Sequence, residues 1–154
     1  MEYCFSVDLV KTLLLCCIGF ILCIKAAGAE HQVVLVAGST SPLHDISSIE
    51  LRKIFLGFNV MRDGHVVKGL RNTGDEDLNR IFLQTVVAMS EKSYMRRQLS
   101  QTLRKGIPRS LEYDNLEDLI KALSSNPYSV SYMREDAAER EPDVKILRVL
   151  WEKY

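Results

Sequence analysis

The chain has 154 residues, and its 20 lysines and arginines balance 20 aspartates and glutamates, giving a formal net charge of zero. This balance provides no general attraction to nucleic acid or to an anionic membrane, so we expect neither as a partner. All four cysteines lie in the first 23 residues, at positions 4, 16, 17 and 23. The rest of the sequence therefore excludes a disulfide framework, a thiol nucleophile and a cysteine metal site.

The segment 1–29 has the pattern of an N-terminal export signal. Lys11 precedes an apolar run over residues 12–24, and the Ala-Gly-Ala sequence at 27–29 supplies the small-x-small pattern of a cleavage site. No later segment is apolar enough to span a membrane, so we expect no membrane span after cleavage. The sequence therefore predicts an exported, periplasmic protein.

We expect cleavage between Ala29 and Glu30, which leaves a single domain at residues 30–154. Two alternatives stay open. The first is an uncleaved anchor, although an apolar run of about thirteen residues is short for a bilayer. The second is lipidation at Cys23, which the large apolar residues at 20–22 disfavour because small residues normally precede a lipidated cysteine.

After the signal, the sequence predicts a buried strand and then a short capped helix. Gln32–Ala37 is a nearly continuous apolar run, which is typical of a strand covered on both faces. Ser47 and Glu50 have the spacing of a capping box at the start of a helix over about 49–56. Gly57 follows at the position of a left-handed C-terminal cap.

The middle of the sequence predicts a turn at Asp63-Gly64, a strand over His65–Leu70 and then a long amphipathic helix. Thr73 or Asp75 can cap that helix. Its apolar residues follow the helical period and form one stripe: Leu78, Ile81, Phe82, Thr85, Val86 and Met89.

The second half of the domain alternates between helices and strands. Asp114 and Glu117 have a second capping-box spacing. The expected elements are a helix from Ser90 to Gly106, a short strand at 111–113, a helix over 116–123, a strand over 128–133, a charged loop over 134–142 and a final strand over 145–150. This alternation predicts a single α/β domain with a mixed sheet flanked by helices.

Four phrases carry a resemblance to a known family. They are I-S-S-I-E-L-R-K-I-F-L-G at 46–57, a strand ending in Arg71, a helix bearing Phe82, and N-P-Y-S-V-S-Y-M at 126–133. Their order resembles the phosphate-type substrate-binding proteins of ABC importers, built as a type II periplasmic-binding-protein-like domain. The resemblance implies a lobe of that fold and a periplasmic solute-binding-like protein. Such a protein would bind phosphate or another small oxyanion for transport or sensing.

The sequence departs from that family at the position of the anion. In full-length phosphate binders the arginine is followed by a Ser-Gly-Thr turn at a helix N-terminus. Here the turn is Asp75-Glu76-Asp77, whose carboxylates would repel phosphate. The chain also has about half the length of a two-lobed binder, in which a cleft between lobes encloses the ligand. The alternative is a ligand-free interaction or accessory module that kept the fold and binds an envelope protein.

Two segments are candidates for holding an oxyanion. The resemblance leaves Arg71, Thr73 and Gly74 facing the anion, and the planar fork of an arginine suits such a ligand. The other interpretation of Arg71 is a surface arginine paired with Asp75 or Asp77. The second segment contains Ser39, Thr40 and Ser41, which form either a small anion-binding loop or an ordinary connection.

Basic residues on the helix after Ser90 are candidates for docking a partner. Arg96, Arg97 and Arg104 form either a face for an acidic partner or the helix's solvated side. The three histidines are scattered and lack metal-ligand spacing, so we expect no metal site. No G-x-S-x-G elbow or paired catalytic motif is present, so we expect neither an enzyme nor a cofactor.

Overall fold

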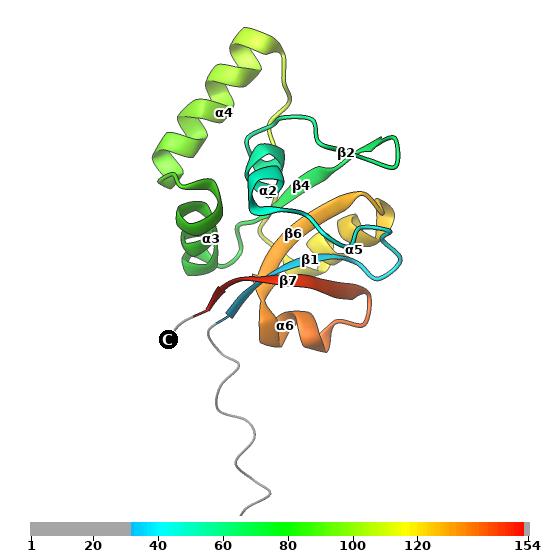
Figure 1. Ribbon diagram of the computed structural model, residues 1–154. Coiled ribbons are helices and arrows are strands. Elements are labelled where there is room, and N and C mark those ends of the chain that lie inside the picture. Colours follow the sequence, from blue (N-terminus) through cyan, green and yellow to red (C-terminus); the bar gives the residue numbers. More distant parts are fainter. Residues whose placement is uncertain (1–31, 153–154) are drawn as a thin grey trace, which may run out of the picture. The chain divides into compact units, whose positions relative to one another are not determined.

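The computed structural model describes residues 32–152, and the predicted export signal with its cleavage site lies outside them. Its elements are β1 (Gln32–Gly38), α2 (Ser48–Phe55), β2 (Met61–Arg62), β3 (His65–Val66), β4 (Lys68–Asn72), α3 (Glu76–Phe82), η1 (Leu83–Val87), α4 (Glu91–Lys105), β5 (Leu111–Tyr113), α5 (Leu116–Ser125), β6 (Ser129–Arg134), α6 (Glu135–Arg140) and β7 (Val144–Glu152). Figure 1 shows their arrangement.

Five strands form one mixed sheet in the order β5-β4-β6-β1-β7. Strand β4 runs parallel to both β5 and β6, whereas β1 is antiparallel to β6 and β7. Strands β2 and β3 form a separate hairpin. The predicted single α/β domain with a mixed sheet is therefore confirmed, and β1 is the strand that reverses direction.

Helices cover both faces of this sheet, as the apolar character of β1 predicts. Val33, Leu35 and Ala37 belong to a core that includes residues of α2, α3 and α4. The alternate residues Val34 and Val36 pack with residues of α5 and α6 on the other face. Figure 1 shows α6 beside β1 and β7, with α2 and α3 across the sheet. The centre of β1 is consequently buried from both sides.

The capped helix α2 is confirmed in detail. The amide of Glu50 donates to Ser47 Oγ at 3.3 Å, and the amide of Ser47 donates to Glu50 Oε2 at 3.1 Å. These reciprocal bonds form the predicted capping box. Gly57 follows with φ of +80°, a conformation that only glycine adopts without strain.

The long helix predicted after Asp75 begins as expected but ends early. Asp75 is its cap, because Asp75 Oδ1 accepts from the Leu78 amide at 2.9 Å. The α-helix ends at Phe82, and the π-helical turn η1 follows it directly. Ala88 then adopts a left-handed conformation with φ of 56°. Leu78 and Phe82 of the predicted stripe are buried in the core, but Thr85 is exposed. Leu83 and Val87 of the π-helical turn are buried in its place, because the wider turn changes which side chains face the core.

Three local predictions are wrong. Residues 134–142 do not form a loop, since α6 occupies Glu135–Arg140 and an Asp136–Arg140 ion pair of 2.7 Å supports it. The cap of α5 is Asn115, whose side chain accepts from the Glu117 amide at 2.8 Å. The strand predicted over 65–70 is split at Val67, whose amide donates to Val60 O instead.

Candidate functional site

Arg71 lies in β4 with its side chain only 1% exposed. One terminal nitrogen donates to Glu112 of β5, and the other donates to Asn79 Oδ1 at 3.0 Å and to Glu91 Oε1 at 3.2 Å. Its Cζ lies 4.8 Å from the ring centroid of Tyr94, within range of a cation–π contact. Arg71 therefore joins β4 to β5, α3 and α4.

The surroundings of Arg71 hold it in the charged form. Burial lowers its pKa, but Tyr132, Glu112 and Glu91 more than offset that effect, so the pKa lies above the ordinary value. Asn79 completes the arrangement, because its Oδ1 also accepts from the Tyr132 hydroxyl at 2.8 Å. The interpretation of Arg71 as a surface arginine paired with Asp75 or Asp77 is wrong, since its carboxylate partners are Glu91 and Glu112.

Thr73 and Gly74 follow Arg71 and connect the end of β4 to the β5–α5 segment. The Thr73 amide and hydroxyl both donate to Tyr113 O, at 2.8 and 3.1 Å. A Cβ atom on Gly74 would lie 2.3 Å from the backbone oxygen of Asp114, so this close approach requires glycine. Both residues therefore have local structural roles beside any contact with a ligand.

A hollow of about 220 Å³ lies at the carboxyl ends of β4 and β6. Asp75 and Asp114 contribute carboxylates to it, and Arg134 Nε donates to Asp75 Oδ2 at 2.6 Å. That bond is the main reason that the pKa of Asp75 is lowered and the pKa of Arg134 is raised. Crevices at the carboxyl ends of parallel strands are the usual ligand sites of α/β sheets. In this crevice the cation is Arg134, and it is already paired with Asp75.

The segment Ser39–Ser41 lies near the opposite end of the sheet. Ser41 is buried and its hydroxyl donates to Pro127 O, just before β6 begins. Ser39 and Thr40 are exposed beside it. Because β6 and β4 run in the same direction, this loop is at their starts, whereas Thr73 is at the end of β4. The two candidate anion-binding segments are therefore not brought together.

The basic face of α4 is solvent-accessible along most of its length. Arg96 donates to Ser93 Oγ at 3.5 Å, and Arg97 lies with its Cζ 6.0 Å from the ring centroid of Phe58. Arg104 is exposed in the last turn of the helix. Over residues 32–152, none of these three arginines forms an ion pair with a carboxylate.

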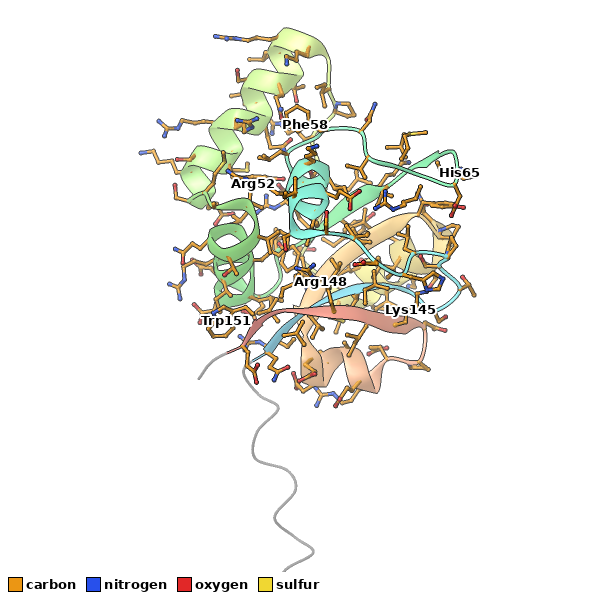
Figure 2. The ribbon with its side chains drawn as sticks, in the orientation of Figure 1. Arg52, Phe58, His65, Lys145, Arg148 and Trp151 are labelled. Carbon is orange, nitrogen blue, oxygen red and sulfur yellow. The ribbon has the colours of Figure 1, made fainter. Side chains whose placement is uncertain are left out.

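The structure also has a groove that sequence reasoning did not find, which we call the Phe58 groove. Its volume is about 490 Å³, and its lining is largely apolar. It lies between the segment before β5 and the end of the β2–β3 hairpin, and Figure 2 shows Phe58 beyond the end of α2 with His65 on the hairpin. The lining residues are Ile54, Gly57, Phe58, Asn59, Val66, Val67, Lys68, Gly69, Leu70, Ile107, Pro108, Arg109, Ser110 and Leu111.

The described part of the chain has neither a metal-binding cluster nor a membrane-spanning helix. Residues 32–152 contain no group of three or more histidines, cysteines, aspartates or glutamates placed to hold a metal ion. No helix in that range combines the length and the apolar character needed to cross a membrane.

No model of a known protein family matches the sequence, and no curated protein matches it. Solved structures match in fold. An ABC-type phosphate transport receptor from Vibrio cholerae matches with a TM-score of 0.51 and 11% identity over 79% of this chain and 48% of the receptor. PstS from Borrelia burgdorferi matches with a TM-score of 0.51 and 15% identity over the same shares.

The chain thus spans about half the length of the phosphate receptors that it matches. At such low identity the similarity concerns the fold, and it agrees with the resemblance that the ordered sequence phrases indicate. The described domain is a mixed α/β sheet flanked by helices, and its fold is similar to about half of each of these phosphate receptors.

Proposed function

We propose that this chain is an exported binding module, periplasmic once its signal is removed, which uses a solute-binding fold to hold a protein partner. One observation carries the proposal: Arg71 is buried, and its terminal donors are engaged by Glu112, Asn79 and Glu91 of the same chain. An oxyanion would have to displace two carboxylates to reach it. The arginine that the family resemblance assigns to the ligand therefore acts as an internal connection.

The hollow beside Gly74 supports the same conclusion. Asp75 and Asp114 border it, and Arg134 is already paired with Asp75. An anion placed there would meet a nearly neutral ion pair and a further carboxylate, so little electrostatic attraction remains. The chain spans about half the length of the phosphate receptors that it matches, and two-lobed binders enclose small ligands in a cleft between lobes.

A second candidate function is binding of a small oxyanion at this hollow. The favouring observation is its position at the carboxyl ends of β4 and β6, next to Gly74 and Arg134, in a fold shared with phosphate receptors. Binding of such a ligand would break the ion pair between Arg134 and Asp75, and the Asp75 carboxylate would have to move away or become protonated. A partner or a second copy would have to cover it.

Calorimetry separates the two candidates. Phosphate, sulfate and acetate are titrated at millimolar concentration into the wild-type protein, Arg134→Gln and Arg140→Gln. Arg140→Gln is the matched control, because Arg140 is an exposed arginine paired with Asp136 away from the hollow. We expect no heat from any protein. Heat that persists in Arg140→Gln and disappears in Arg134→Gln would establish the oxyanion function instead.

The protein-partner proposal needs its own positive result. A photoreactive residue is placed at the exposed positions Ile49, Leu103, Leu111 or Glu117 and activated in intact cells. We expect a specific adduct at one or more of these positions, and the captured protein should bind again when both proteins are purified. Absence of an adduct at all four positions would contradict the proposal.

A further inference from the structure

Several apolar side chains of the Phe58 groove are partly exposed. Phe58 is 44% exposed, Val66 is 38% exposed and Leu111 is 57% exposed. They come from three separate segments: the connection after α2, the hairpin and the edge strand β5. A hollow with a mainly apolar lining and a few polar groups is the usual form of a binding site.

The charged residues in the lining of the groove have a single sign. Lys68 and Arg109 are in its lining, and the lining contains no aspartate or glutamate. Neither cation forms an ion pair within the part of the chain that the structure describes. Arg97 adds a third cation beside the Phe58 ring. An occupant with negative charge would therefore be attracted and oriented.

Backbone groups at the groove have unused hydrogen-bonding capacity. Pro108, Arg109 and Ser110 line the groove as the irregular segment before β5, and they make no backbone–backbone hydrogen bond within residues 32–152. Such groups fit an occupant with its own amide donors and acceptors.

We propose that the Phe58 groove binds an extended segment of a partner protein in which acidic and apolar side chains are interleaved. The apolar side chains cover Phe58, Val66 and Leu111, and the acidic side chains pair with Lys68 and Arg109. The peptide backbone supplies hydrogen bonds to the 108–110 segment. This inference rests on the proposed function, because it names the surface and the chemistry of the partner.

A second copy of this chain fits the groove less well. Two copies meeting through this face about a two-fold axis would bring Lys68, Arg109 and Arg97 of one copy against the same residues of the other. Like charges at an interface disfavour association. A small apolar acid would satisfy the cations but would leave the backbone of 108–110 without partners.

The test uses a displayed library of random twelve-residue peptides as the probe. Peptides are selected on the purified wild-type protein, and their dissociation constants are measured by fluorescence anisotropy. We expect the selected sequences to be enriched in aspartate and glutamate interleaved with leucine, isoleucine and phenylalanine. Affinity should also fall as salt increases, because the ion pairs are partly exposed.

Variants of exposed residues then locate the site without disturbing the fold. Leu111→Asp should weaken binding by about tenfold or more, and the Lys68→Glu/Arg109→Glu double variant should do the same, because both introduce repulsion toward an acidic peptide. Leu103→Asp is the matched control, since Leu103 is 76% exposed on α4 and is not in the groove lining. A peptide with its acidic residues changed to lysine should regain affinity for the double variant.

Three results would overturn the assignment. They are a selection without acidic enrichment, selected peptides that bind Leu111→Asp as tightly as the wild type, and a wild-type dimer in light scattering that Leu111→Asp dissociates. The last result would identify a second copy as the occupant. If a cross-linked partner binds equally well to wild type and Leu111→Asp, the proposed function stands and the groove assignment fails.

Discussion

The guanidinium of Arg71 lies over the ring of Tyr94, with Cζ 4.8 Å from the ring centroid. Tyr94 comes from α4, and Arg71 comes from the centre of the β5–β4–β6 part of the sheet. The Tyr94 hydroxyl in turn donates to Phe55 O of α2 at 2.8 Å. A buried polar network therefore joins the sheet to two helices on one face.

Removing the Arg71 charge should destabilise the fold. Arg71→Met keeps the apolar stem but removes the charged donor that Glu112, Glu91 and Asn79 share, and we expect a loss of about 2–3 kcal/mol in the free energy of unfolding. The value is at the low end for a buried pair because both carboxylates are about half exposed. Denaturant titration followed by circular dichroism measures it.

Arg80→Met is the control for this prediction. Arg80 pairs with Asp77 on the surface of α3, where both side chains are more than 60% exposed. We expect a change within about 0.5 kcal/mol. Equal losses in the two variants would contradict the role of Arg71 as an internal connection.

The Phe55 carbonyl tests how this network shares its donors. It accepts from the Tyr94 hydroxyl at 2.8 Å and from Gln98 Nε2 at 3.1 Å. Tyr94→Phe should cost about 1 kcal/mol, because Gln98 still satisfies the carbonyl. Combining it with Gln98→Leu removes both donors, and the double variant should lose more than the two single variants together. Simple additivity in urea unfolding would show that the two donors act independently.

Glu50 should make the stability of the chain depend on pH in the acidic range. Hydrogen bonds from Ser47, followed by those from Arg62, lower the pKa of Glu50 from 4.5 to about 2. A lowered pKa in the folded state means that the carboxylate stabilises the fold above pH 4.5 and loses this effect as pH falls toward 2. Glu50→Gln should lower Tm by roughly 2 °C at neutral pH.

Thermal unfolding between pH 2 and pH 7 checks this prediction. The gap in Tm between wild type and Glu50→Gln should be constant above about pH 5 and should close near pH 2. Arg62→Met removes the second cause of the lowered pKa, so the gap should then close at a higher pH. A gap that is unchanged at pH 2 would show that the Glu50 charge does not stabilise the cap.

Gly74 should not tolerate a side chain, although its substitution looks mild. A Cβ atom there would lie 2.3 Å from Asp114 O, so Gly74→Ala should push β4 away from the β5–α5 connection at a cost of about 2–3 kcal/mol. Gly106→Ala is the comparison, because nothing lies within 4 Å of its Cβ position and its φ of +65° costs about 1 kcal/mol. Equal destabilisation of the two variants in guanidinium would contradict the close approach at Gly74.

Local chemistry allowed several elements to be predicted without the fold. Ser47 and Glu50 are three residues apart, so their capping box depends on the helix start alone. The continuous apolar run at 32–37 required cover on both faces, which implied helices on each side of the sheet. A loop was predicted at 134–142 because α6 is a short, charged helix in which the only buried residue is Ala138. Its sequence therefore lacks the apolar periodicity that indicates a helix.

Periodicity predicted the mixed α/β class and the double-sided burial of β1, and the order of four short phrases indicated the resemblance to phosphate receptors. The role of Arg71, in contrast, depends on tertiary packing. Glu91 and Glu112 are far from it in sequence, and their approach depends on how α4 and β5 pack beside β4. The Phe58 groove also depends on tertiary packing, since three separate segments create it. No local sequence pattern in any of these segments indicates that they come together.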